Sequence, residues 1–297
     1  MIRLNFENLL ADTIDHLNSV QQQINNEADF EHQVIKAKSK WDSKTSTTEA
    51  KAAFVDIKEK LISMCSGAEI CVYCEHNEAS DIEHIYPKRL YPSKCFRWEN
   101  YVFACGKCNT HFKKEKFSIF NPVNSVTIQD ITPQRKVYVR PDNEDTLFIN
   151  QRLEDPMTFL ELDFIEKTFY FFERQGENTR EYEKAKYTKD ILGLNKRDDL
   201  VQHRKAAFYY FKSELARYLA IQNSHDMNEL SNSLDGILDT VDTTLEFQQE
   251  KTRILNSIKN RIKKHNHPTV WKEMIRQRAN LPDTNLLFEQ VPEALAW

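Results

Sequence analysis

Two pairs of cysteines place the strongest constraint on how this chain can fold. Cys71 and Cys74 form one C-x2-C pair, Cys105 and Cys108 form a second, and 30 residues separate them. Each pair offers two sulfur ligands from one tight turn, so together they supply the four thiolates of a tetrahedral zinc site. Because four protein ligands close the coordination shell, the zinc is expected to be structural. An iron–sulfur centre on the same four thiolates stays open as an alternative.

The positions of the cysteines and the first residues of the chain indicate whether disulfides are expected. All six cysteines lie between Cys65 and Cys108, and the first residues lack the charged, apolar and small-residue pattern of an export signal. We therefore expect a cytoplasmic protein in which cysteines bind metal before they form disulfides. Cys65 and Cys95 have no partner at ligand spacing and are expected to be small buried apolar residues.

Charge and hydropathy exclude two classes of protein. The 41 Lys and Arg residues against 45 Asp and Glu residues give a net charge of −4, which excludes a uniformly basic nucleic-acid coat. A polyanion would have to be bound by a local basic patch. No apolar run approaches the roughly 18 residues of a membrane span, so we expect a soluble protein with no membrane partner.

The predicted fold class is mainly α, with a small α+β core between helical N-terminal and C-terminal regions. Only five glycines in 297 residues favour long helices over a loop-rich or barrel fold. Helical spacing of apolar residues covers 6–25 and 28–41, and a third predicted helix begins at the Ser-Thr cluster 46–48 and ends at Gly67.

The second half of the chain is also predicted to be largely helical. A helix over 177–192 ends at Gly193, and Asn195 is expected to cap a long helix over 196–222. An apolar stripe from Leu230 to Ile262 keeps helical spacing and predicts a further helix, acidic in its first half and basic in its second. Strands are predicted over 136–139, 158–164 and 167–172. The predicted regions are 1–66 (helical), 67–122 (the cysteine-framed core), 123–175 (a strand-containing connector) and 176–297 (helical).

Between the cysteine pairs, Glu83 and His84 form an acid–histidine pair in a short β-prone run that Pro87 closes. A carboxylate is a hard-oxygen ligand for a divalent cation, and an imidazole with a near-neutral pKa can take a proton from water. Neighbouring side chains in a regular strand point to opposite faces, so both can serve one site only where the chain bends.

Two asparagines flank the second cysteine pair. The amide of Asn100 can pin a loop by bonding to its backbone, and Asn109, which directly follows Cys108, can offer a neutral oxygen to a metal. Basic residues are concentrated in the same segment. Between His84 and Phe117 there are eight bases and two acids, a local charge of +6, which is where phosphates are expected to bind. The residues predicted to contact nucleic acid are Lys88, Arg89, Lys113, Lys114 and Lys116.

These elements together resemble the HNH, or ββα-metal, nucleases of the cysteine-framed type. The resemblance covers about 50 residues and is carried by Cys71-x2-Cys74, Ile82-Glu83-His84-Ile85-x-Pro87-Lys88, Trp98-x-Asn100 and Cys105-x2-Cys108-Asn109 with the lysines that follow. It implies an endonuclease that hydrolyses phosphodiester bonds with Mg²⁺ or Mn²⁺, in which His84 is the general base and Asn100 orients its loop. The implied ligands of the catalytic cation are Glu83 and Asn109.

The chain departs from the family pattern at two places. The acid before the histidine is commonly Asp, whereas here it is Glu83, and the last lysine falls at Lys113 because His111 and Phe112 intervene. His111 is therefore an alternative to Asn109 as a ligand of the catalytic cation.

The wider chain is similar to the larger bacterial HNH proteins of anti-phage systems, the PtuB-type partners of Septu and some retrons. That likeness is carried by Tyr73-Cys74-Glu75, the run from Glu83 to Lys88, the run from Asn100 to Cys105 and the stretch 150–156. It implies an ABC- or OLD-like (PtuA-type) ATPase as partner and DNA as substrate, with tRNA as the alternative. Two other interpretations are a non-catalytic zinc module that binds nucleic acid and a scaffold subunit with a vestigial core.

Overall fold

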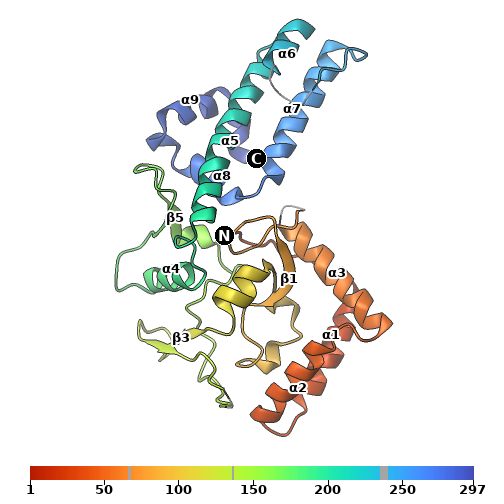
Figure 1. The fold of residues 1–297 in the computed structure, drawn as a ribbon, viewed down its shortest axis with the longest axis vertical. Coiled ribbons are helices and arrows are strands. Elements are labelled where there is room, and N and C mark those ends of the chain that lie inside the picture. Colours follow the sequence, from red (N-terminus) through yellow and green to blue (C-terminus); the bar gives the residue numbers. More distant parts are fainter. Residues whose placement is uncertain (66–67, 136, 235–239) are drawn as a thin grey trace. The chain divides into compact units, whose positions relative to one another are not determined.

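The structure of the protein is a computed structural model that describes residues 1–65, 68–135, 137–234 and 240–297 (Figure 1). The described residues divide into two units. Unit 1 consists of Met1–Glu161 and Tyr170–Arg197, and unit 2 consists of Leu162–Phe169 and Asp198–Trp297. The predicted N-terminal helices and the cysteine-framed segment therefore belong to the same unit.

Three helices begin unit 1, as predicted: α1 (Ala11–Asn25), α2 (Phe30–Asp42) and α3 (Thr48–Met64). Helix α1 starts later than expected because the residues before it are extended and bond to other segments. The Ile2 N–H donates to the Val72 carbonyl (3.0 Å), and the Leu4 N–H donates to the Gln151 carbonyl (2.9 Å). The predicted stop of α3 at Gly67 lies outside the described residues.

A β-hairpin lies between the two cysteine pairs. Strand β1 (Ala79–His84) pairs antiparallel with β2 (Tyr101–Cys105), with His84 opposite Tyr101 and Glu83 opposite Val102. All five residues of β2 are buried, so this strand lies in the core of unit 1. The helical segment η3 (Lys107–Lys113) follows directly and is wound as a π-helix. Hairpin and helix in this order match the expected small α+β arrangement.

The other strands are short. Strands β3 (Ser118–Phe120) and β4 (Ile128–Asp130) form one pair, and β5 (Leu160–Leu162) and β6 (Phe171–Glu173) form another. The predicted strand at 136–139 is wrong for residues 137–139, which are irregular, and residue 136 lies outside the described residues. The strand predicted over 167–172 begins only at Phe171, because Lys167 and Phe169 have positive φ angles of 58° and 57°, which extended strands do not allow.

Unit 1 ends with α4 (Arg180–Ile191), which Gly193 terminates with a φ of 60°, as predicted. The predicted cap at Asn195 is wrong. Its amide instead accepts from the Phe171 N–H (2.9 Å) and donates to the Phe171 carbonyl (2.8 Å), which fixes the start of β6.

Most of the described residues of unit 2 are helical. Its main helices are α5 (Asp198–Gln222), α6 (Met227–Ser233), α7 (Phe247–Lys264), α8 (Pro268–Arg276) and α9 (Pro282–Gln290). The continuous helix predicted from Leu230 to Ile262 is wrong, because α6 ends at Ser233 and residues 240–246 are irregular. Only the second half of the apolar stripe forms one helix, α7, whose Arg261 pairs with Glu214 of α5 (2.9 Å).

Five short 3₁₀ turns complete the described elements: η1 (Pro92–Lys94), η2 (Trp98–Asn100), η4 (Pro156–Thr158), η5 (Arg278–Asn280) and η6 (Pro292–Ala296). Among the described helices, none combines the length and the apolar composition that crossing a bilayer requires.

Candidate metal centre and histidine site

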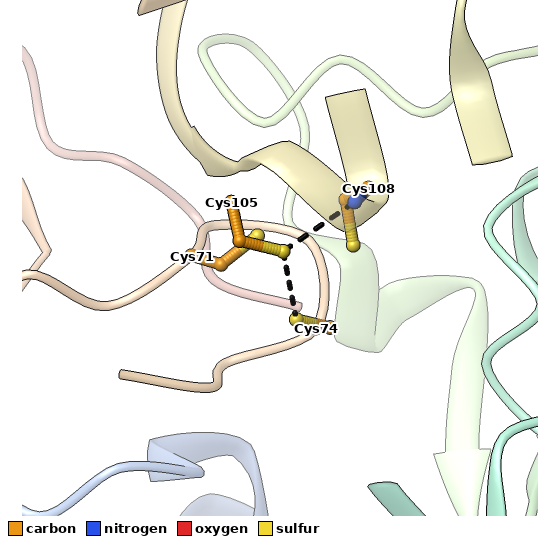
Figure 2. A group of neighbouring side chains, drawn as sticks. All are labelled: Cys71, Cys74, Cys105 and Cys108. Carbon is orange, nitrogen blue, oxygen red and sulfur yellow. Dashed lines mark hydrogen bonds between the residues drawn. The ribbon is translucent and has the colours of Figure 1, made fainter. Parts of the chain in front are cut away.

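The four paired cysteines come together at one end of the β-hairpin (Figure 2). Their sulfur atoms all lie within 4.8 Å of one another, the Cys74 and Cys105 sulfurs are 3.8 Å apart, and all four residues are buried. A tetrahedral ion with metal–sulfur bonds of about 2.3 Å separates its sulfurs by roughly 3.8 Å. The four cysteines are therefore placed to bind one metal ion, as a structural zinc site requires. Sulfurs this close favour a single ion over a cluster of several irons.

Local backbone bonds explain how the two pairs meet. The Val72 N–H, inside the first pair, donates to the Phe103 carbonyl of β2 (2.9 Å). Glu75 closes that turn with a φ of 65°, and its N–H donates to the Cys71 carbonyl (2.8 Å). Cys105 is the last residue of β2, and the Cys108 N–H donates to the Cys105 sulfur (3.4 Å). The hairpin thus carries the second pair to the first.

The electrostatics of the cluster differ between its members. Hydrogen bonds with the other three cysteines lower the pKa of Cys105, whereas burial raises the pKa of Cys71 and the hydrogen bond with Cys105 raises the pKa of Cys108. Arg197 Nη1 lies 3.3 Å from the Cys108 sulfur and brings a positive charge to the site. Positive charge stabilises thiolates, and such outer contacts orient metal ligands. No sequence spacing pointed to Arg197, which is 89 residues from Cys108.

His84, the expected general base, lies inside unit 1 with 4% of its surface exposed. Its Nε2 is 2.8 Å from the Cys95 carbonyl oxygen. A carbonyl only accepts, so Nε2 carries the proton and Nδ1 is the basic nitrogen of the neutral ring. Burial, together with the charges of Lys88 and Lys113, lowers the pKa of His84 to about 3. The ring is therefore neutral at pH 7.

Helix α2 supplies a residue to this site that sequence reasoning missed. The Trp41 indole lies 4.2 Å from the His84 ring, centroid to centroid, at an angle of 61°. The ammonium groups of Lys44 and Lys88 lie 4.9 Å and 6.0 Å from the same indole centroid. No spacing in the sequence connects Trp41 with His84.

The side chain of Glu83 contacts η3, whereas the ring of His84 contacts α2. Lys113 of η3 is fully buried, and its Nζ donates to Glu83 Oε1 (2.6 Å) and to the His84 carbonyl (2.7 Å). Lys113 was expected to contact phosphate, but its ammonium is occupied by Glu83 and the backbone.

The amide of Asn109 donates to Asp81 Oδ2 (3.0 Å). Asp81 and Glu83 are two residues apart on β1, and Asn109 and Lys113 are four apart on η3, so one face of η3 meets one face of β1 in two polar pairs. Glu83 and Asn109 make no hydrogen bond to each other in the described structure.

The chemistry of these donors fits a hard cation, because carboxylate and amide oxygens are what Mg²⁺ and Mn²⁺ prefer. Within the described ranges, however, the cysteine cluster is the one group of three or more His, Cys, Asp or Glu residues whose ligand atoms meet. His111, the alternative ligand, is exposed on η3.

Asn100 joins the segment after β1 to the turn η1. Its Oδ1 accepts from the Tyr86 N–H (2.7 Å), and its Nδ2 donates to the carbonyls of Tyr86 (3.0 Å) and Lys94 (2.9 Å). All of these bonds are to backbone atoms of the loop that follows His84.

The other predicted phosphate contacts differ in exposure. Lys114 and Lys116 are exposed, and Lys88 is half-buried beside Trp41. Arg89 is half-buried; it lies 3.5 Å from Glu115 and donates to the Gln134 carbonyl. The structure therefore leaves Lys114 and Lys116 most open to solvent.

Comparison with known proteins shows a partial similarity. In an alignment of 75 positions that covers 22% of the chain, the sequence is 35% identical to the Septu protein PtuB of Bacillus thuringiensis. The match covers 28% of that protein, so the chain corresponds to less than a third of its length. No family model and no solved structure matches the chain.

Proposed function

We propose that this protein is a metal-dependent endonuclease of the HNH type that hydrolyses phosphodiester bonds of nucleic acid, with DNA as the expected substrate. The observation that carries the proposal is the hydrogen bond from His84 Nε2 to the Cys95 carbonyl at 2.8 Å. It selects the tautomer in which Nδ1 is free to accept a proton, which a general base requires. The hairpin, the helix and the cysteine cluster around it support the same proposal.

In the proposed reaction, His84 Nδ1 takes a proton from a water molecule, and the resulting hydroxide attacks phosphorus in line with the leaving 3′-oxygen. The His84 ring begins neutral, because burial lowers the pKa of His84 to about 3. Asn100 keeps the loop after His84 in place through three backbone bonds. Exposed Lys114 and Lys116 are suited to bind the phosphate backbone, which carries no base sequence information.

Glu83 and Asn109 are the proposed ligands of Mg²⁺ or Mn²⁺, with His111 as the alternative to Asn109. When bound, such an ion supplies charge stabilisation to the phosphoryl and leaving oxygens. Since Lys113 neutralises Glu83 at 2.6 Å, the ion would compete with that ammonium for the carboxylate.

The similarity to Septu protein PtuB supports a role in an anti-phage defence system. We propose that the protein is the nuclease of such a system and acts with an ABC- or OLD-like (PtuA-type) ATPase. A tRNA substrate is the alternative to DNA within the same proposal.

The test is cleavage of plasmid DNA and of total RNA with Mg²⁺ or Mn²⁺, in the presence and absence of a candidate ATPase partner. Wild type should cleave one substrate and His84→Ala should not, whereas His32→Ala, at an exposed histidine, should cleave normally. EDTA should stop cleavage reversibly while tightly bound zinc remains. A His84→Ala protein with full activity would refute the mechanism, and binding without cleavage under all conditions would favour a zinc-containing binding or scaffold subunit.

A further inference from the structure

Gln21 of α1 is a buried polar residue, 1% exposed, that reaches across to the turn η1. Its Nε2 donates to the Pro92 carbonyl (3.0 Å) and to Asn25 Oδ1 (2.9 Å), and its Oε1 accepts from the Phe96 N–H (2.7 Å). One amide side chain thus bonds to the backbone at both ends of the segment 92–96.

The Phe96 N–H and the Cys95 carbonyl belong to the same peptide group. The carbonyl end of this group accepts from His84 Nε2 (2.8 Å) and from the Tyr101 hydroxyl (2.8 Å). A peptide group is planar, so its two ends cannot turn independently. Gln21 and His84 are therefore bonded to opposite ends of one rigid unit, and hydrogen bonds in such a chain strengthen one another.

We infer that Gln21 is a positioning residue for His84. Its side chain fixes the Cys95–Phe96 peptide so that the Cys95 oxygen holds the proton on His84 Nε2 and leaves Nδ1 as the base. The inference rests on the proposed function where it concerns cleavage, but the effect on the His84 tautomer is a property of the folded protein alone.

A side-chain amide at position 21 makes both hydrogen bonds, because its oxygen accepts from the Phe96 N–H and its nitrogen donates to the Pro92 carbonyl. Gln21→Met keeps the length of the side chain and removes both bonds. Gln21→Glu keeps the acceptor for Phe96 and loses the donor to Pro92. The matched control is Gln22, the next residue of α1, which is exposed and makes the same kind of bond to Asn26 Oδ1 (2.8 Å) without reaching η1.

The first readout is the steady-state rate at which the zinc-loaded protein cleaves plasmid DNA in Mg²⁺. Misplacement of a catalytic group by about 1 Å can cost on the order of 100-fold in rate. We expect Gln21→Met to lower kcat by about 10- to 100-fold with KM within about twofold of wild type. The kcat of Gln21→Glu should lie between those of wild type and Gln21→Met, because this variant retains the bond to Phe96. The kcat of Gln22→Met should match that of wild type.

The second readout is the ¹⁵N chemical shifts of the His84 ring at pH 7, which do not depend on activity. Wild type and Gln22→Met should show the Nε2–H tautomer, and Gln21→Met should show a mixture of tautomers. If wild type cleaves nothing while the tautomer still changes in Gln21→Met, the positioning role stands and the nuclease proposal fails. An unchanged tautomer in folded Gln21→Met and Gln21→Glu overturns the inference, as does a cleavage loss that appears only as a higher KM.

Discussion

Lys113 Nζ lies 2.6 Å from Glu83 Oε1, and the lysine side chain is fully buried. A buried charge is costly unless it is paired, and each member of this pair neutralises the other. The pair joins η3 to β1 immediately beside the residue proposed as general base. A divalent ion that binds Glu83 must displace the Lys113 ammonium. The same ion pair therefore affects both the stability of unit 1 and the binding of the proposed catalytic ion.

Replacing Lys113 should destabilise unit 1 markedly. Lys113→Met leaves the Glu83 carboxylate buried without its partner, and removal of one partner from a buried ion pair costs about 3–5 kcal/mol. Urea unfolding with circular dichroism measures the change. Lys114→Met, at the exposed neighbour, should change the free energy of unfolding by less than about 0.5 kcal/mol. Equal effects of the two substitutions would show that the Glu83–Lys113 pair does not act as described.

Removal of one clustered cysteine should remove the metal. We expect wild type to contain one zinc per chain, and Cys108→Ser to lose it and to unfold at a lower temperature, since metal binding energy is folding energy. Cys65→Ala is the matched control, because Cys65 is equally buried and lies outside the cluster. Metal analysis by mass spectrometry checks both. Retention of stoichiometric zinc by Cys108→Ser would exclude the four-sulfur site.

Gly193 should tolerate no side chain. Its φ is 60°, and a Cβ there would lie 2.4 Å from the Phe112 ring of η3. Gly193→Ala should therefore lower the free energy of unfolding by about 1–3 kcal/mol or more, because left-handed backbone strain adds to the steric conflict. Gly176→Ala is the control, since nothing lies within 4 Å of the corresponding Cβ position. Similar melting temperatures for both variants would contradict the packing of 193 against η3.

The acid dependence of stability should contain a contribution from His84. Burial lowers the pKa of His84 to about 3 from an ordinary value of 6.5, so the folded protein favours the neutral ring. This stabilisation is complete above pH 6.5 and is lost as the pH falls from 6.5 toward 3. Urea unfolding at pH 7 and pH 4.5 should therefore show a smaller acid loss for His84→Gln than for wild type.

The control for this measurement is His32. Its hydrogen bond to Asp29 raises the pKa of the exposed ring, so its contribution is present at low pH and is lost as the pH rises. His32→Gln should not reduce the acid loss. An identical acid loss in wild type and His84→Gln would show that the His84 ring is not held neutral.

Local patterns determined much of this protein. The two C-x2-C pairs predicted the sulfur cluster, because each pair is a single turn whose geometry depends on few residues. The periodicity of apolar residues predicted α1 to α3, and Gly193 predicted the end of α4, since helix ends depend on nearby backbone conformation.

Longer patterns were less reliable where tertiary contacts compete with local preference. The stripe from Leu230 to Ile262 keeps helical spacing across a segment that is irregular at 240–246. Asn195 has the chemistry of a cap, yet its amide bonds to Phe171 in β6. Helical spacing alone cannot reveal such partners, which are distant in the sequence.

The surroundings of the histidine were decided only by the tertiary structure. The sequence by itself named Glu83, His84, Asn100 and Asn109, but it could not show that Glu83 pairs with Lys113 or that Trp41 lies against the His84 ring. Periodicity in the sequence predicts which face of a helix or strand a residue lies on, but not which distant residue it contacts. The contacts that set the protonation and orientation of the His84 ring come from the Cys95 carbonyl at the end of η1 and from Trp41 of α2, and their effect depends on burial and distance in three dimensions.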